Sequence, residues 1–479
     1  MIVVGGGPGG STLAWDLARK GVAVTVLERT RFPREKVCGD YVEPRGLRIL
    51  ERMGTLERLE TGGPLRITHS ATYVDGECRY RGEIPFYGLG GDLPPHGYII
   101  ARDELDDAML RTAAEAGATV HEETPATAVD LGTDGVAVEA KRSGRAVRYR
   151  ARLVVGADGV NSVVARGAGL AVDDPRYVAV AQRAYATVAD DVGEAAFFFD
   201  HELFPGYGWV FPLAGGRVNL GVGILSETRQ KLGLQVPELF AAFVAGLGKA
   251  NARWRTLELC APPIGGIVRT YGAAGPNHFD GGVLVGDAGG FVDPMTGEGI
   301  TPAMESALLA SPVLCRALDV GRFDAAQLQA YETAFRAHFD PAMAFLDLCA
   351  ATLRNRHLAG PWLKALARGC ELASSDPDFA RTGGAYFGGL DVRPYGILGQ
   401  MWLRVLEDLA LAWPRTLTGA ARGTTLTDLV GWQAALLQSL LAEPLWHTRW
   451  AADIQRKWLR VLAPGARGQD PRFSGVASS

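Results

Sequence analysis

The stretch that decides the fold is Ile2-Val-Val-Gly-Gly-Gly-Pro-Gly-Gly10, at the start of the chain. Its apolar run and the spacing Gly5-x-Gly7-x-x-Gly10 predict a strand, a tight turn and a helix over about Ser11–Lys20. A second apolar run ends at Glu28, which lies 18 residues beyond Gly10. This order is typical of a dinucleotide-binding βαβ unit. Its glycines let the backbone approach a pyrophosphate, and an acid roughly 20 residues further on accepts hydrogen bonds from a ribose.

Length and composition exclude several classes of protein. A chain of 479 residues predicts two or three domains, and 47% hydrophobic with 21% charged residues is typical of a globular protein. The net charge of −4 gives no electrostatic reason to expect nucleic acid. Six cysteines without CxxC spacing, and histidines without ligand spacing, predict no metal site and a reducing compartment.

The chain shows no sign of a targeting or membrane-spanning segment. Met1 runs directly into the first apolar run, which predicts no signal peptide. No apolar stretch reaches the ~18 residues needed to cross a bilayer. We therefore expect a cytoplasmic protein; peripheral contact with a membrane and the oligomeric state stay open.

Two further glycine-containing motifs follow apolar runs. The first is Gly156-Ala-Asp-Gly-Val-Asn-Ser162, and the second runs from Gly286-Asp287-Ala288 to Asp293–Ile300, before a helix expected at about Thr301. Asp287 is placed to accept a hydrogen bond from a sugar-like hydroxyl, and the amides of 297–300 can hold an electron-rich ring. A nicotinamide enzyme would not need this third element, whereas a flavin extends across the sheet, so the motifs together predict FAD.

The three motifs resemble the FAD-binding fold of the para-hydroxybenzoate hydroxylase type, and their details resemble the geranylgeranyl reductase family. The resemblance covers roughly residues 1–320. It is carried by Gly5 to Gly10, Phe32-Pro-Arg-Glu-Lys-Val-Cys-Gly-Asp40, Arg102 with Leu105-Asp106, Pro205-Gly-Tyr-Gly-Trp-Val-Phe-Pro212 with Asn219–Gly223, and Gly286 to Ile300.

The resemblance implies a set of cofactor-binding positions. FAD would be held by Gly5, Gly7, Gly10, Glu28, Arg102, Asp287, Gly299 and Ile300, with the flavin stacked near Cys38, Gly39 and Pro294. We add Pro8, Arg29, Ala126, Asp158, Gly286 and Gly297 to the same set. For Asp158, capping its own turn is an equal alternative. Electrons would come from NAD(P)H directly or from a flavin-reductase partner.

Two related flavoenzyme groups fit less well. Aromatic hydroxylases usually carry a histidine after the Gly-Asp-Ala step, where this chain has Gly289. Flavin-dependent halogenases carry Trp-x-Trp-x-Ile-Pro and a Ser-Ser-Gly loop, where this chain has Tyr207–Pro212 and Thr296–Gly299. Both departures favour the reductase branch.

The predicted fold class is α/β. We expect a Rossmann-type FAD-binding domain with an inserted antiparallel β-sheet substrate domain and an α-helical C-terminal region. The FAD-binding domain is discontinuous, over residues 1–64, 101–174 and 273–320, with the sheet domain over 65–100 and 175–272. The helical region covers 321–465 and a disordered tail 466–479.

Local patterns predict further elements. Helices are expected over 44–60 and about Arg102–Ala116, with three strands over 118–155. Two C-terminal apolar stripes, one over 398–413 and one with Leu429, Trp432, Leu436 and Leu440, are interpreted as packed core rather than a membrane surface.

Four residues are candidates for catalysis, each with a structural alternative. Cys38 would shape the flavin environment, or be a small buried apolar group. Asp40 would supply a proton if burial raised its pKa, although capping its loop is favoured. Tyr207 and Trp209 would line a tunnel for an apolar chain, with plain core packing favoured for Trp209. Glu298 is favoured as a loop constraint rather than a base.

The favoured hypothesis is reduction of carbon–carbon double bonds in an isoprenoid or related apolar substrate by reduced flavin. An isolated alkene is a poor hydride acceptor, so a proton donor is needed, and the sequence does not single one out. The first alternative is a monooxygenase that hydroxylates or epoxidises, and a halogenase is less favoured. The last is a non-catalytic flavoprotein or lipid carrier.

Overall fold

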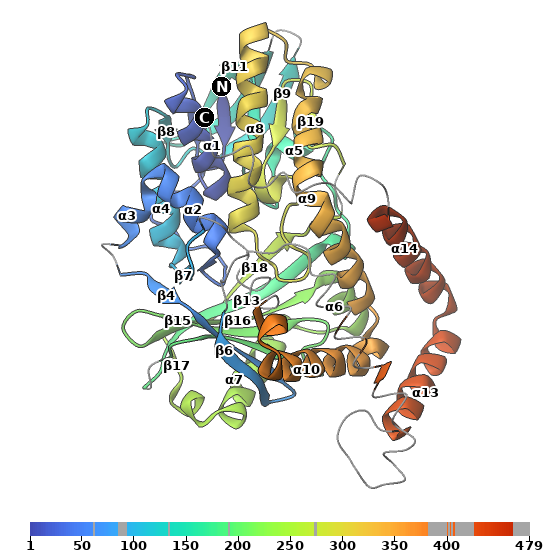
Figure 1. Cartoon of the computed structure of the whole chain (residues 1–479). Helices are drawn as coiled ribbons and strands as arrows, with labels where there is room; N and C mark the ends of the chain where they lie inside the picture. The colour runs from blue at the N-terminus through green and yellow to red at the C-terminus, as the bar shows by residue number, and fades with distance from the viewer. Residues whose placement is uncertain are drawn as a thin grey trace.

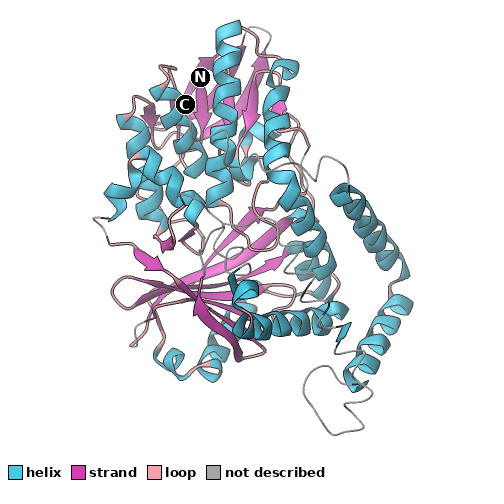
Figure 2. Ribbon diagram, viewed as in Figure 1, coloured by secondary structure: helices cyan, strands magenta, loops and turns pink. Residues whose placement is uncertain are grey.

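The computed structural model describes residues 1–60, 63–84, 93–132, 135–189, 192–272, 275–381 and 426–462, with four single positions at 400, 403, 406 and 407. The predicted tail over 466–479 and most of the stripe over 398–413 lie outside these residues. Two large sheets form separate layers, and long helices run beside both (Figures 1 and 2). The predicted α/β class, with a Rossmann-type layer and a second sheet, is confirmed.

The first sheet has the strand order β19-β20-β12-β1-β2-β8. Its centre is β1 (Ile2–Val4), which pairs in parallel with β2 (Thr25–Leu27) and with β12 (Val154–Gly156). The flanking strands are β8 (Thr119–His121), β20 (Gly282–Leu284) and the antiparallel β19 (His278–Phe279). The helices α1 (Pro8–Arg19), α4 (Arg102–Glu115) and α8 (Ile300–Val320) share a buried core with it. Because β1, β12 and β20 are neighbours, the three glycine motifs that follow them meet at one edge.

The second sheet contains eight strands. These are β5 (His69–Val74), β6 (Glu77–Glu83), β13 (Val178–Thr187), β14 (Ala195–Phe199), β15 (Tyr207–Leu213), β16 (Arg217–Leu225), β17 (Glu258–Leu259) and β18 (Ile264–Arg269). The prediction of an antiparallel sheet holds for every pair except β14 and β5, which run parallel. The helix α7 (Val236–Ala250) packs on it through a second core that includes Phe240 and Phe243.

Two small sheets complete the described strands. One holds β3 (Tyr41–Val42), β7 (Gly97–Ile99) and β4 (Leu65–Ile67), and the other holds β9 (Ala126–Gly132), β10 (Gly135–Arg142) and β11 (Arg145–Ala151).

Several predicted elements differ in detail. The helix expected over 44–60 is two helices, α2 (Pro44–Met53) and α3 (Thr55–Glu60), because Gly54 adopts a left-handed conformation with φ 77°. The prediction of three strands over 118–155 is wrong, since β8 to β12 all lie there. The region 175–270 also holds α6 (Ser226–Leu232) and α7 besides its strands.

The C-terminal region is helical where it is described. It contains α9 (Ala325–Leu353), α10 (Ala359–Ser375), α13 (Leu426–Ala442) and α14 (Pro444–Leu462). α14 lies beside α9, where Arg460 pairs with Asp340 at 2.9 Å and Trp450 Nε1 donates to the Ala351 carbonyl at 2.8 Å (Figure 1).

The predicted packing of the second apolar stripe is wrong for Leu440, which is 42% exposed, and Leu441 beside it is 77% exposed. Contact with a membrane surface stays a prediction. None of the helices in the described ranges is both long and apolar enough to span a bilayer.

Candidate active site

A cavity of about 610 Å³ lies between the carboxyl edge of the first sheet and the inner face of the second. Of the predicted cofactor-binding positions, only Gly10 does not line it; the others, from Gly5 to Ile300, all do. Cys38, Tyr207 and Trp209 line it as well, whereas Asp40 lies behind the wall. The structure therefore gathers nearly the whole predicted set, and the role of each residue stays a prediction.

The glycine loop is built for a close backbone approach. Gly5 has φ 102°, and a Cβ there would lie 2.3 Å from the Ala157 carbonyl oxygen. A Cβ on Gly10 would lie 2.0 Å from the Gly5 oxygen, so Gly10 serves the packing of the loop rather than the cavity surface. At Gly7, in contrast, the nearest atom to such a Cβ would be 3.7 Å away, which leaves the start of α1 open toward the cavity.

Glu28 holds the same loop from the end of β2. Its Oε2 accepts a hydrogen bond from the Gly6 amide at 2.8 Å, and its Oε1 accepts from the Thr30 amide at 2.9 Å. The carboxylate is buried and also lines the cavity. A carboxylate has about four acceptor positions, so it can still accept from a ribose hydroxyl.

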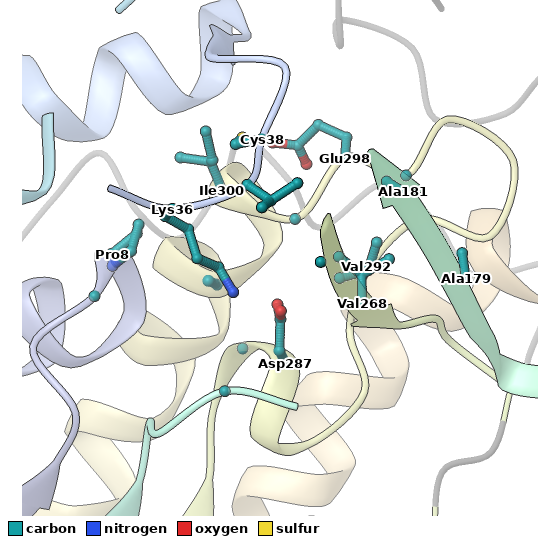
Figure 3. Close-up of a pocket in the computed structure, with 18 of the residues that line it drawn as sticks. Pro8, Lys36, Cys38, Ala179, Ala181, Val268, Asp287, Val292, Glu298 and Ile300 are labelled. Carbon is teal, nitrogen blue, oxygen red and sulfur yellow. The ribbon is translucent and has the colours of Figure 1, made fainter. Parts of the chain in front are cut away.

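The second helix N-terminus at the cavity is that of α8. Gly299 is its N-cap and has no side-chain cap, and Glu298 Oε1 accepts from the Thr301 amide at 2.8 Å. The predicted loop-constraining role of Glu298 agrees with this bond. Asp287 and Lys36 point into the same space from opposite sides (Figure 3). A phosphate or a reduced ring would meet the positive end of the helix there.

Asp158 makes the local contacts of a turn cap. It accepts from Ser162 Oγ at 2.5 Å and from the Val163 amide at 2.6 Å, at the start of α5 (Val163–Gly167). It also lines the cavity, so both interpretations of this residue remain consistent with its position.

Arg102 is held by a buried carboxylate. Asp106 is fully buried and receives two hydrogen bonds from Arg102, each 2.8 Å long. Arg34, in the loop after β2, also contacts Asp106 at 3.0 Å. Both guanidinium groups line the cavity, which gives it two fixed cations beside the glycine loop.

Asp40 belongs to a buried hydrogen-bond network that joins the Cys38 loop to the second sheet. Its Oδ2 accepts from Asn219 Nδ2 at 2.7 Å and from the Tyr185 hydroxyl at 2.8 Å. Asn219 also receives a hydrogen bond from Trp209 Nε1 at 2.9 Å and donates to the Cys38 carbonyl at 2.8 Å. Burial raises the pKa of Asp40 to about 6 and also raises the pKa of the Cys38 thiol. The thiol is therefore neutral near pH 7, and because Cys38 is partly exposed where it lines the cavity, both interpretations of it stay predictions.

Replacing Asp40 with asparagine is expected to flatten the dependence of stability on pH. A carboxyl whose pKa rises on folding, here from 3.8 to about 6, binds more protons in the folded state across that interval. The wild-type protein should therefore lose about 3 kcal/mol of unfolding free energy from this site as the pH rises from below 3.8 to above 6, at 1.36 kcal/mol per pKa unit, and about 2 kcal/mol of this falls between pH 4 and 6. Urea denaturation of both proteins at a series of pH values measures it, and a parallel pH profile in the two would contradict it.

Tyr207 and Trp209 occupy different surroundings on β15. The Tyr207 hydroxyl donates to the Thr296 carbonyl and so ties the second sheet to the loop before α8. Trp209 is 6% exposed, packs in a core with Phe211, and fits over Gly221, where a Cβ would lie 2.3 Å from its ring. Most of the Trp209 side chain is therefore buried in this core, and the residue also lines the cavity.

Arg34, Lys36 and Glu43 are among the cavity residues that were not singled out from the sequence. Arg34 and Lys36 lie in the stretch that carries the family resemblance, and Glu43 follows shortly after it. For Arg34 and Lys36, the position within that stretch was the available signal; Glu43 had none. Among the described residues, no cluster of His, Cys, Asp and Glu has the makings of a metal site.

These residues fit FAD. An open helix N-terminus beside a glycine turn suits a pyrophosphate, Glu28 suits a ribose, and the N-terminus of α8 suits the ring. Residues 1–199 match a protein family described as "FAD binding domain". Fold and site therefore define an FAD-dependent oxidoreductase, and FAD is its cofactor.

Curated relatives identify the branch. A menaquinone reductase of Mycobacterium tuberculosis is 32% identical over 334 residues, covering 66% of this chain and 76% of that protein. A digeranylgeranylglycerophospholipid reductase of Methanopyrus kandleri is 31% identical over 352 residues, covering 71% and 82%. The chain belongs to the geranylgeranyl reductase family of FAD-dependent oxidoreductases.

Solved structures support the fold. A geranylgeranyl bacteriochlorophyll reductase-like protein of Thermoplasma acidophilum has a TM-score of 0.64 at 24% identity, covering 74% of this chain and 87% of that one. A flavin-dependent halogenase has a TM-score of 0.61 at 24% identity, covering 74% and 65%.

Proposed function

We propose that this protein reduces carbon–carbon double bonds of an isoprenoid or related apolar substrate. The observation that carries the proposal is the continuity of one cavity, which runs from the nucleotide-binding loop to an apolar wall on the second sheet. The names of the two curated relatives, both reductases of molecules that carry prenyl chains, support it.

The apolar wall lies opposite the nucleotide loop. Ala179 and Ala181 of β13, Val268 of β18 and Val292 present small aliphatic groups to the cavity (Figure 3). Small residues here leave room for a chain, and each buried methylene contributes about 0.8 kcal/mol to binding. Phe197, Tyr207 and Phe211 add aromatic surface on the neighbouring strands.

When bound, reduced FAD supplies a hydride to one carbon of the double bond. The chain's own part is to hold the substrate against the flavin site, exclude water and supply a proton to the other carbon. The electron donor belongs to the proposal as well: NAD(P)H, or a flavin-reductase partner.

The decisive experiment uses the purified FAD-loaded protein. With dithionite-reduced enzyme and no oxygen, a polyprenyl substrate such as geranylgeranyl diphosphate should gain two hydrogen atoms per double bond, seen by mass spectrometry. Gain of an oxygen atom only in air would establish the monooxygenase instead. Chlorination of an aromatic substrate would establish a halogenase, and no change with any substrate would favour a carrier. Adding NADPH or NADH in place of dithionite identifies the donor.

Replacing Ala181 with tryptophan should obstruct the apolar end of the cavity. We expect FAD to stay bound, because Ala181 lies on the second sheet away from the glycine loop, while turnover of a long prenyl chain falls by tenfold or more, roughly as for other pocket-blocking changes. Steady-state kinetics with short and long prenyl substrates measure it. Ala241→Trp, at an exposed position of α7 outside the cavity, is the matched control; equal turnover in both variants would place the substrate elsewhere.

A further inference from the structure

A group of acidic side chains surrounds one guanidinium at the side of the cavity where α2, α8 and the loop before α8 meet. Arg45 contacts Glu305 on α8 at 3.0 Å and Glu43, the N-cap of α2, at 3.3 Å. His338 of α9 contacts the other oxygen of Glu305 at 3.2 Å. Glu43 and Glu305 are less than a tenth exposed, so the group is shielded from solvent.

Glu298 stands at the cavity end of this group. It lines the cavity together with Glu43, and its side chain projects into the space (Figure 3). Its Oε1 is bonded to the Thr301 amide, so the direction of the carboxyl group is fixed. Arg45 is bonded to Glu43 and Glu305, and its charge also acts on Glu298.

Negative charge exceeds positive charge around Glu298. The groups that face it are Glu43 and Arg45 from α2, Asp293 from its own loop and Glu305 from α8, and His338 reaches the group only through Glu305. Tyr41 of β3 and Cys38 line the cavity nearby. Buried carboxyl groups that share one guanidinium oppose each other's ionisation, so we expect the group to retain a proton at neutral pH.

The directions of the pKa changes agree with this count. Burial, and then the charges of Asp293 and Glu305, raise the pKa of Glu43 to about 7 against the opposing effect of Arg45. Burial and the charge of Glu43 raise the pKa of Glu298 well above its usual value, against the opposing effects of the Thr301 amide hydrogen bond and the charge of Arg45. Arg45 contacts Glu43 at 3.3 Å and favours its ionised form, so we assign the retained proton to Glu298, whose carboxyl group reaches the cavity.

We infer that Glu298 is the general acid that protonates the substrate double bond, and that Glu43, held in place by Arg45, is the positioning residue whose charge keeps Glu298 protonated. This inference rests on the proposed function. In the step, the Glu298 O–H bond breaks and its electron pair stays on the carboxylate. The π pair of the alkene forms the new C–H bond, and the hydride supplied by reduced FAD completes the second one. A proton from solvent then restores the acid.

The first test replaces Glu298 with glutamine, which preserves the acceptor for the Thr301 amide. Loss of a general acid typically costs 10²- to 10⁴-fold in rate, so we expect anaerobic alkene reduction to fall by at least about 100-fold. Flavin absorbance and the rate of flavin reduction should match those of the wild type. Glu51→Gln, on the exposed face of α2, is the control and should reduce the substrate normally. Reduction by E298Q at the wild-type rate would overturn the inference.

The second test does not depend on turnover. Infrared difference spectroscopy of the holoenzyme at about pH 8.5, above the pKa values of Glu43 and Asp40, should show a protonated carboxylic acid that is absent from E298Q. In the Glu43→Gln variant, one negative charge is gone, so the pKa of Glu298 should fall. Both the infrared titration and the alkaline decline in rate should then move to lower pH. A band that persists in E298Q, or a pH profile that does not move in E43Q, would count against the assignment.

The two tests also separate this inference from the proposed function. If the wild-type protein reduces no prenyl chain, the proposed function fails, and the catalytic role of Glu298 fails with it. The infrared measurement would then still decide whether Glu298 holds the proton. If the wild type reduces the chain and E298Q does so equally well, only the inference fails.

Discussion

Replacing Gly10 with valine should yield a protein that is colourless after purification. A Cβ at this position would lie 2.0 Å from the Gly5 carbonyl oxygen and 3.2 Å from the Ala157 side chain, and the first contact is with backbone, which cannot rotate away. The loop must shift, so its amides leave the positions that suit a pyrophosphate. Overpacking of this kind costs typically 1–3 kcal/mol, so the affinity for FAD should fall about 100-fold. Fluorescence titration of the apoprotein with FAD measures the loss.

The control for this variant is Gly246→Ala. Gly246 lies within α7, and a Cβ there meets nothing within 4 Å. That variant should bind FAD normally and be more stable by roughly 0.5–1 kcal/mol, because alanine is the better helix former. Normal FAD affinity in Gly10→Val would show that the turn tolerates displacement, and the cofactor assignment of the loop would have to be revised.

Replacing Asp106 with leucine is expected to destabilise the protein by about 3–5 kcal/mol. Asp106 is fully buried. It accepts two hydrogen bonds from Arg102 and forms an ion pair with Arg34. Removing the carboxylate leaves a buried guanidinium without its partner, which is the costly way to break such a pair. Chemical denaturation of the apoprotein gives the change in unfolding free energy.

A double variant separates stability from cofactor binding. Arg102→Met with Asp106→Leu replaces the pair by apolar groups and should recover much of the lost stability, since buried ion pairs are often replaceable in this way. FAD affinity of the double variant should be lower than that of the wild type, because Arg102 lines the cofactor cavity. A double variant with normal FAD affinity would remove Arg102 from the cofactor site, and a wild-type denaturation midpoint for Asp106→Leu would show that the pair contributes little to stability.

The nucleotide-binding half could be predicted from the sequence because its signals are local. The apolar run, the glycine spacing and Glu28 fall within 30 residues. Each of them follows from the local requirements of the strand, the turn and the nucleotide, and does not depend on distant parts of the chain. Local reasoning failed where one residue changed the conformation: the apolar spacing continues from Leu47 to Leu59, yet Gly54 ends the first helix in a left-handed turn.

The chemistry of the site could not be predicted in the same way, because it depends on residues far apart in the chain. Asp40 meets Tyr185 across 145 positions and Asn219 across 179. The surroundings of Glu298 are set by Glu43 and Arg45, which precede it by more than 250 residues. From the sequence, Glu298 between two glycines is interpreted as part of a turn. Its charged neighbours on α2 become known only from the structure.

The interleaving of the first sheet has a consequence for biosynthesis. β1 is made at once, but its neighbours β12 and β20 end at residues 156 and 284, and α8, whose N-terminus lines the cavity, begins at Ile300. A ribosome must therefore release more than half of the chain before the cofactor can be captured. Until then the early strands have unpaired edges, which favours aggregation and dependence on chaperones. We therefore expect riboflavin added to the culture during expression to raise the yield of active protein more than FAD added later, during refolding of the purified chain.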